Sequence, residues 1–356
     1  MVAISEIDKY AIKAYYALHD KNIPNLGDIS KIKVEDIPEH DLFTYSYPCQ
    51  SLSVAGKQEG MIKGKTRSGL LYECEKIIEH CRPKYLLLEN VKNLVGKKFK
   101  PQFDEWLAYL ESLGYTSYWK VLNAKDYGVP QNRERVFVIS ILGDHKPYKF
   151  ADKTPLDRCI ADILEDKVDE KYYINKSFHL VNKGYQAELD TKGMGCIKSY
   201  IEYKGKKIEL PCIGASRGRN PKNPSSRIPG EPTEQRLEIN TKGISNTITT
   251  VQKDNYVIEP KIICEQRCDE GLRFFKDNVC GTIRAKDSGG DKRIIEYTYG
   301  IRKLTPRECF RLMGLKDDDI DKIQQAGISN AQQYKMAGNS IVVDVLEVIF
   351  RNLFLD

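Results

Sequence analysis

The chain has 356 residues, of which 41% are hydrophobic and 30% charged, and its formal net charge is +6. This length is enough for one large or two ordinary domains, and the hydrophobic share excludes a disordered chain. The charge permits a polyanionic partner without requiring one. No apolar run is long enough to span a membrane, and the segment MVAISEIDKYAIK carries acidic residues too early for a signal peptide.

The cysteines bear on the cellular compartment. Ten cysteines are scattered along the chain, with no CxxC pair and no metal-ligand spacing to the five histidines. Scattered thiols in a chain of this length are typical of a reducing compartment and not of a disulfide framework. We therefore expect a cytoplasmic protein with no metal site and no membrane association.

Short apolar runs alternate with helical patterns over the first 142 residues. Strands are expected at 2–5, 42–46, 85–88, 115–122 and 135–142. A first helix would use Ile7, Ala11, Ala14 and Leu18 as its apolar face, a second would cover 69–81 and stop before Pro83, and a third around 106–113 would end at Gly114. This alternation predicts an α/β fold, a doubly wound parallel sheet covered on both faces.

The pattern changes between 143 and 302. Glycine and proline become frequent, and basic residues gather in SRGRNPKNPSSR at 216–227. Segments 243–259 and 278–296 share a Thr-Ile step, a Lys-Asp pair and a closing Ile-Glu, which favours two related β-hairpins. Helical patterns return at 306–313 and 340–353, the latter apolar enough to pack on the first sheet. We expect one α/β domain, 1–142 plus 303–356, with a mostly β or irregular domain, 143–302, inserted into it.

Three polar motifs lie at ends of the predicted strands. Cys49, in Tyr47-Pro48-Cys49-Gln50, follows one strand, and Glu89 ends another, so both belong to the edge where open α/β sheets bind ligands. Gln131, Arg133 and Arg135 share one face of the extended chain before an apolar strand. Taken singly, the cysteine is more often a buried apolar residue, the glutamate is as often a helix cap, and the third motif is as often a solvated strand end.

Together with the C-terminal segment, these motifs resemble the cytosine-C5 DNA methyltransferases of prokaryotic restriction-modification systems or phages. The segment RKLTPRECFRLMG at 302–314 is similar to the penultimate motif of that family, and Gly338-Asn339-Ser340 before a helix is similar to its last. The resemblance covers 4–142 and 302–353 motif by motif, and the middle of the chain only in general form. It implies a Rossmann-like methyltransferase sheet with an inserted target-recognition domain.

The resemblance implies covalent catalysis on a flipped cytosine. The Cys49 thiolate would add to C6 of the base, Glu89 would donate a proton at N3, and Arg135 would contact the base carbonyl. Gln50 and Arg133 would belong to the same catalytic group. Since C5 and C6 cannot be reached inside a stacked duplex, the base must be flipped out.

The resemblance also implies S-adenosylmethionine as cofactor and double-stranded DNA as substrate. On the cofactor side, Glu6 would bind the ribose hydroxyls and Asp28 the adenine amino group, and Leu71, Asn339 and Ser340 match further positions. Segment 51–65 matches the loop that closes over the flipped base. The expected DNA-binding residues are Ser53, Gly56, Lys57, Gln58, Gln131, Thr247, Arg217 and Arg219. Whether Thr247-Ile248 or Thr282-Ile283 is the counterpart of the family's Thr-Leu element stays open.

The chain departs from the family at its start. No Phe-x-Gly-x-Gly turn is present, and residue 4 already matches the second strand of the family. We expect Met1 to be an internal methionine of a longer reading frame or the chain to be truncated, with a second polypeptide as the alternative source of the missing strand. Residues 1–356 alone are then expected to bind S-adenosylmethionine poorly and to methylate DNA weakly or not at all. Micromolar cofactor binding in calorimetry would contradict this expectation.

Two other functions stay open. One is a catalytically inactive DNA-binding remnant of such an enzyme, and the other is a transfer-RNA cytosine-C5 methyltransferase. The long basic middle segment favours DNA over transfer RNA. We expect a monomer, and whether a cognate restriction endonuclease is encoded in the same operon stays open. The recognition sequence does not follow from motif spacing, because base readout depends on loop geometry.

Overall fold

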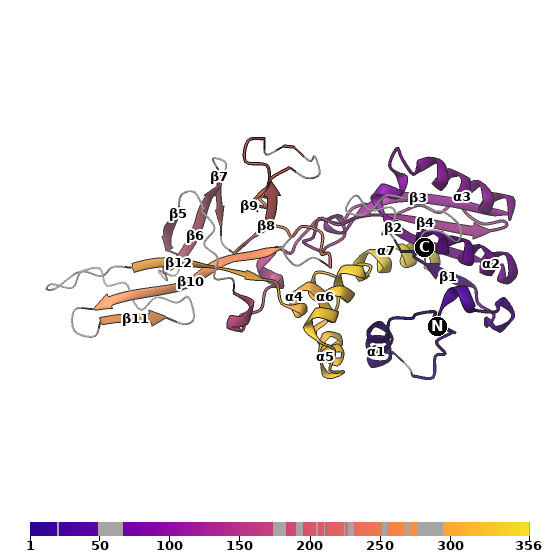
Figure 1. The fold of residues 1–356 in the computed structure, drawn as a ribbon, viewed down its shortest axis with the longest axis horizontal. Coiled ribbons are helices and arrows are strands. Elements are labelled where there is room, and N and C mark those ends of the chain that lie inside the picture. The colour runs from indigo at the N-terminus through magenta and orange to yellow at the C-terminus, as the bar shows by residue number, and fades with distance from the viewer. Residues whose placement is uncertain are drawn as a thin grey trace. The chain divides into compact units, whose positions relative to one another are not determined.

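The computed structural model describes residues 1–19, 21–48, 67–173, 183–189, 195–203, 206–209, 211–223, 225–226, 231–250, 255–267, 271–275 and 295–355. The chain divides into two compact units (Figure 1). Unit 1 comprises Met1–Leu156 and Met313–Asp356, and unit 2 comprises Asp157–Leu312. Among the described helices, none is long and apolar enough to cross a membrane.

Unit 1 contains a four-stranded sheet in the order β1-β2-β4-β3. The strands are β1 (Leu42–Tyr45), β2 (Tyr85–Val91), β3 (Tyr115–Asn123) and β4 (Glu134–Leu142). β1 runs parallel to β2, but β4 runs antiparallel to both β2 and β3. The prediction of a fully parallel sheet is therefore wrong at β4. A parallel pair needs a crossover of a dozen or more residues, whereas the connection from β3 to β4 holds only a short 3-10 turn at Ala124–Asp126.

Helices lie on both faces of this sheet. Helices α2 (Leu71–Cys81) and α3 (Lys100–Ser112) share one hydrophobic core with the even-numbered side chains of β2. On the other face, the ring of Phe354 packs edge-on against Tyr85 at 5.1 Å, which brings α7 (Val343–Phe354) onto the sheet as predicted. The predicted stops are also confirmed, since α2 ends before Pro83 and α3 ends before Gly114, whose φ is +84°.

The N-terminal prediction is only partly confirmed. Val2–Ser5 forms no extended strand, and Ile4 makes a single parallel bridge to Asn25. Helix α1 (Lys9–Leu18) begins after Asp8, whose carboxylate accepts hydrogen bonds from two backbone N–H groups of the first turn. Ile7 precedes the helix and is 72% exposed, and Ala14 is the buried member of the predicted apolar face. The apolar face is therefore narrower than the sequence pattern indicated.

The sequence predicts two helices after residue 303, at 306–313 and 340–353, whereas the structure forms four there. They are α4 (Pro306–Arg311) in unit 2, and α5 (Asp317–Gln325), α6 (Asn330–Asn339) and α7 in unit 1. The helix expected from residue 340 begins at Val343, because Ser340 is the C-cap of α6. The tight link between these two helices places the Gly338–Ser340 segment at a helix end.

Unit 2 is mostly β-structure. One sheet has the order β11-β10-β8-β9, with β12 also paired to β10, and a second has the order β5-β6-β7. The strands are β5 (Lys183–Leu189), β6 (Gly195–Tyr203), β7 (Lys206–Glu209), β8 (Cys212–Arg219), β9 (Glu234–Ile239), β10 (Tyr256–Arg267), β11 (Gly271–Phe275) and β12 (Ile295–Lys303). The hairpin expected at 243–259 is not formed as predicted, since 243–250 is turn and irregular chain. Its counterpart at 278–294 lies outside the described residues.

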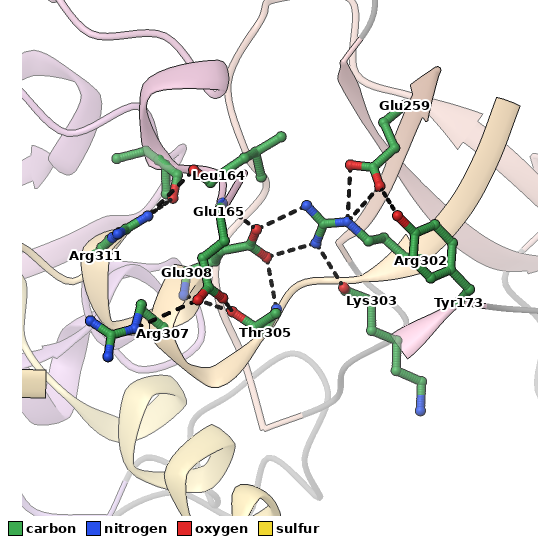
Figure 2. Close-up of polar contacts among 11 residues, drawn as sticks. Leu164, Glu165, Tyr173, Glu259, Arg302, Lys303, Thr305, Arg307, Glu308 and Arg311 are labelled. Carbon is green, nitrogen blue, oxygen red and sulfur yellow. Dashed lines mark hydrogen bonds and ion pairs between the residues drawn. The ribbon is translucent and has the colours of Figure 1, made fainter. Parts of the chain in front are cut away.

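A buried group of ion pairs connects the larger sheet of unit 2 to α4 (Figure 2). The Arg302 side chain, at the end of β12, is fully buried. Its guanidinium lies 2.9 Å from a carboxylate oxygen of Glu259 on β10 and 2.8 Å from one of Glu308 on α4. Thr305 and Glu308 form a capping box at the start of α4. These contacts join two strands of the sheet to the helix that follows them.

Candidate active site

A buried carboxyl lies at the edge of the unit 1 sheet, at the end of β2. Glu89 is 7% exposed, and its Oε1 lies 3.1 Å from Nε of Arg135. Its Oε2 accepts a hydrogen bond of 3.1 Å from the Ser46 hydroxyl. Because β4 runs antiparallel to β2, the first residues of β4 reach the end of β2, and Arg135 pairs with Val91. The direction of β4 thus brings together two residues that the sequence motifs singled out separately.

The environment of Glu89 raises the pKa of its carboxyl group. Burial raises the pKa of this carboxyl, while the charges of Arg135 and Arg133 and the hydrogen bond from Ser46 lower it in part. The net effect is a raised pKa, so Glu89 can carry a proton at a higher pH than an exposed glutamate. A neutral carboxyl beside a guanidinium can donate a proton to a bound ring nitrogen.

The chain before Cys49 lies at the same edge. The backbone oxygen of Tyr47 accepts a hydrogen bond of 3.1 Å from the side-chain amide of Asn90, next to Glu89. Tyr47 itself is 4% exposed. This contact anchors the end of the segment that leads from β1 into Cys49. The predicted site residues Cys49, Gln50, Ser53, Gly56, Lys57 and Gln58 lie outside the described residues.

The segment just before β4 contacts the C-terminal part of the chain. The Arg133 guanidinium donates hydrogen bonds to the carbonyl oxygens of Gly338 and Ser340, at 3.1 and 2.7 Å. Gln131 is fully buried, and its amide nitrogen lies 3.7 Å from the sulfur of Met313. In this structure the Gln131 side chain is thus packed inside unit 1. Its expected contact with DNA stays a prediction.

The two carboxylates expected on the cofactor side lie on neighbouring segments. Glu6 accepts hydrogen bonds of 2.7 Å from the backbone N–H groups of Ile7 and Asp8. Asp28 accepts them from the backbone and the hydroxyl of Ser30, which hold its pKa below the usual value. The side chain of Asn25 joins the segments, since its oxygen accepts from N–H of Glu6 and its nitrogen donates to the Glu6 carbonyl, both at 3.0 Å.

The other residues expected near the cofactor have different surroundings. Leu71 is 2% exposed and belongs to the core beneath α2. Asn339 is exposed at the end of α6, and the hydroxyl of Ser340 donates to the carbonyl of Met336 at 2.8 Å. Within the described parts of the chain, no group of three or more His, Cys, Asp and Glu side chains could hold a metal ion.

Comparison with known proteins then decides the family. The family model described as C-5 cytosine-specific DNA methylase matches residues 1–355. This chain belongs to the C-5 cytosine-specific DNA methylase family. The expected enzyme class, a DNA cytosine-5-methyltransferase, is thereby confirmed.

Relatives of this methylase include restriction-modification and phage enzymes. Type II methyltransferase M2.ScrFI of Lactococcus lactis subsp. cremoris is 38% identical over 331 residues, which cover 93% of this chain and 71% of that protein. Orphan methyltransferase M.SPRI of Bacillus phage SPR is 32% identical over 414 residues, covering 99% and 91%.

Solved structures support the fold. The Entamoeba histolytica methyltransferase EhMeth matches with a TM-score of 0.59 at 18% identity, covering 99% of this chain and 89% of that one. The S. pombe Dnmt2 methyltransferase matches with a TM-score of 0.58 at 17% identity, covering 100% and 90%. At this identity the likeness shows the fold alone, and it confirms the expected Rossmann-like methyltransferase architecture.

In unit 2 of the methylase, the expected DNA-binding arginines lie on β8. Arg217 pairs in register with Arg236 of β9, so two like charges lie opposite one another. Arg219 forms an ion pair with Glu238, with one hydrogen bond of 2.6 Å. Arg236 in turn lies 3.7 Å from a carboxylate oxygen of Glu234, so acidic residues of β9 lie beside these arginines. The expected role of Arg217 and Arg219 in DNA binding stays a prediction.

Thr247 of the methylase lies in irregular chain. Its carbonyl accepts a hydrogen bond of 3.3 Å from the side chain of Asn255, which is 5% exposed. The oxygen of the same side chain accepts from N–H of Asn246 at 2.8 Å. The Thr282-Ile283 step lies outside the described residues, so the choice between the two steps stays a prediction.

Sequence reasoning missed two residues of this site, Ser46 and Asn90. Both are small polar residues beside motifs that were singled out, and their types alone carry no functional signal. The register of β1 on β2, in which Tyr45 pairs with Leu88, is what brings Ser46 level with Glu89.

Proposed function

We propose that this methylase transfers a methyl group from S-adenosylmethionine to C5 of a cytosine flipped out of duplex DNA, with Cys49 as the nucleophile. The observation that carries the proposal is the buried Glu89 carboxyl, held by Arg135 at the edge where β1 leads into Cys49. A proton donor and a cation that contact the base assist the addition of a thiolate to a pyrimidine ring.

Each proposed catalytic residue has one step. The Cys49 thiolate forms a bond to C6, and the electrons of the C5–C6 double bond move toward N3, where Glu89 supplies a proton. The Arg135 guanidinium binds the base carbonyl and stabilises the charge that builds on the ring. S-adenosylmethionine supplies the methyl group as an electrophilic carbon on a sulfonium. The proton on N3 then returns to Glu89. Water takes the C5 proton, the electrons of that C–H bond form the C5–C6 double bond again, and the C6–sulfur bond breaks so that Cys49 leaves as a thiolate.

The chain's own residues fit the cofactor by their chemistry. Glu6 and Asp28 each use one carboxylate oxygen for the backbone contacts described above, and carboxylates suit ribose hydroxyls and an adenine amino group. Asn25 ties their segments together. Asn339 and Ser340 would lie beside the cofactor at the end of α6, with Leu71 as an apolar wall.

We assign target recognition to the inserted β-rich domain, 143–302, and catalysis to 1–142 plus 303–356. Arg217 and Arg219 would contact DNA phosphates or base edges, together with Thr247 and the loop residues Ser53, Gly56, Lys57 and Gln58. Gln50 and Arg133 would support the catalytic residues. The protein would act as a cytoplasmic monomer, with a cognate restriction endonuclease as the partner expected for a type II methyltransferase.

Covalent trapping tests the proposal. A duplex with 5-fluorocytosine at the target position cannot lose its C5 substituent, so wild-type enzyme with S-adenosylmethionine should form a complex stable to denaturation. Cys49→Ala should form none, whereas Cys159→Ala, which removes an exposed cysteine, should trap like wild type. No complex with the intact Cys49, even at a saturating concentration of S-adenosylmethionine, would favour an inactive DNA-binding remnant. A complex with transfer RNA but not with duplex DNA would favour the transfer-RNA enzyme.

A further inference from the structure

Ser46 lies beside Glu89, the proposed proton donor. It is the first residue after β1, and because Tyr45 pairs with Leu88 of β2, the next residue comes beside Glu89. Its hydroxyl is 3.1 Å from Oε2 of Glu89. Ser46 makes this contact from the strand on one side of β2, whereas Arg135 makes its contact from the strand on the other side.

The two contacts hold different oxygens of one carboxyl. Arg135 lies at Oε1 and Ser46 at Oε2, each at 3.1 Å. The terminal torsion of a glutamate is broad, so one contact alone would leave the carboxyl plane free to rotate. With both oxygens held from opposite sides, the plane is set.

The two partners differ in what they can do when Glu89 changes its protonation state. A guanidinium only donates hydrogen bonds, whereas a hydroxyl can donate to an ionised carboxylate and accept from a protonated carboxyl. We propose that Ser46 is a positioning residue of the methyl transfer reaction, whose hydroxyl keeps the Glu89 carboxyl in one orientation as it gains and loses its proton. This inference rests on the function proposed above, in which Glu89 donates to N3.

The charges around Glu89 give the direction of the expected effect. Arg135 and Arg133, both on the β4 side, favour the ionised carboxylate, as does the hydrogen bond from Ser46, while burial opposes them and prevails. Removing the hydroxyl removes one of the contributions that lower the pKa of Glu89. That pKa should therefore rise in a variant without the hydroxyl.

The test is the pH profile of single-turnover methylation of duplex DNA. Since protonated Glu89 is the active form, the rate falls as the pH rises through its pKa. In Ser46→Ala this alkaline limb should move upward by roughly half a pH unit, and the maximal rate should fall about threefold to tenfold because the carboxyl is less well oriented. Ser46→Thr keeps a hydroxyl and should retain the wild-type profile. S-adenosylmethionine affinity should be the same in all three proteins.

A double variant asks whether Ser46 acts through Glu89. Glu89→Gln should retain a slow residual rate, and adding Ser46→Ala should not lower it further. The proposal is overturned if the Ser46→Ala profile superimposes on that of wild type, if only the thermal midpoint changes, or if the two substitutions multiply their effects. Two other results would refute the proposed function itself. These are full methylation activity of Glu89→Gln, and the absence of a covalent complex between the wild-type enzyme and the 5-fluorocytosine duplex.

Discussion

The guanidinium of Arg133 donates a 2.7 Å hydrogen bond to the carbonyl oxygen of Ser340, which lies 207 residues further along the chain. Ser340 is the C-cap of α6, and the last carbonyls of a helix have no partners within the helix. A buried cation is a favourable partner there, because it also complements the helix dipole. Arg133 thus links the β4 edge that carries Arg135 to the segment expected beside the cofactor.

Arg133→Lys should weaken cofactor binding. Lysine keeps the charge, but a single ammonium cannot reproduce the fixed geometry of two hydrogen bonds from one guanidinium nitrogen. We expect the affinity for S-adenosylmethionine, measured by calorimetry, to fall about tenfold. Arg351→Lys on α7, where the arginine side chain is 62% exposed, is the matched control and should bind like wild type. Equal affinities for both variants would contradict the linking role of Arg133.

Glu89→Gln should change how stability depends on pH. Because the folded-state pKa of Glu89 is raised, its contribution to stability is fully present below the unfolded-state pKa and is lost as the pH rises through the folded-state pKa. Glutamine does not titrate, so raising the pH should shift the difference in unfolding free energy in favour of the variant. Urea unfolding between pH 4.5 and 8 measures this difference. The exposed Glu105→Gln on α3 is the control, and a pH-independent difference for Glu89→Gln would speak against the assignment.

Arg302→Met should strongly destabilise the protein. The substitution would leave the carboxylates of Glu259 and Glu308 without their shared cation, and the Glu308 side chain is fully buried (Figure 2). Removing one partner of a buried ion pair costs about 3–5 kcal/mol. Arg236→Met, at a 3.7 Å pair with Glu234 on the surface, should cost less than about 1 kcal/mol in the same urea titration. Similar losses for the two variants would show that the buried group contributes no more than a surface pair.

Gly314→Ala tests how closely the backbone at Gly314 approaches the side chain of Asp344. Gly314 has a φ of +83°, and a Cβ there would lie 2.1 Å from Oδ2 of Asp344. Gly143 also has a positive φ, +66°, but a Cβ there would meet no atom within 4 Å. Both alanine variants carry the strain of a positive φ. The additional loss of unfolding free energy in Gly314→Ala therefore measures the overlap between the new Cβ and Asp344. We expect this additional loss to be roughly 1–3 kcal/mol by chemical unfolding. Equal losses would mean that Asp344 moves aside without cost.

Arg217→Ala should weaken DNA binding in a salt-dependent way. If Arg217 neutralises a phosphate, its loss should lower affinity uniformly across sequences and reduce the slope of log K against log salt by about 1. The slope is measured by anisotropy titrations of a labelled duplex at several salt concentrations. Arg351→Ala on the exposed side of α7 is the control, and an unchanged slope in Arg217→Ala would remove Arg217 from the phosphate contacts.

Local signals predicted where α2 and α3 of unit 1 end, but they did not predict α5 and α6. Pro83 and Gly114 stop helices where expected, because proline and a left-handed glycine interrupt a helix whatever surrounds them. The prediction of a strand at 2–5 was wrong because strand formation depends on a distant part of the chain. A four-residue apolar run becomes a strand only with a partner, and the structure provides one bridge from Ile4 to Asn25.

The sequence by itself determined which chemical groups the protein carries and their order along the chain, and these motifs were enough to predict the family. Only the tertiary structure decided that β4 runs antiparallel, which places Arg135 rather than the opposite end of β4 beside Glu89. The same holds for Ser46, whose position depends on the register of β1 on β2. The physical reason is that side-chain chemistry and helix stops are local properties. Strand direction and register depend on hydrogen bonds and burial between segments far apart in the chain.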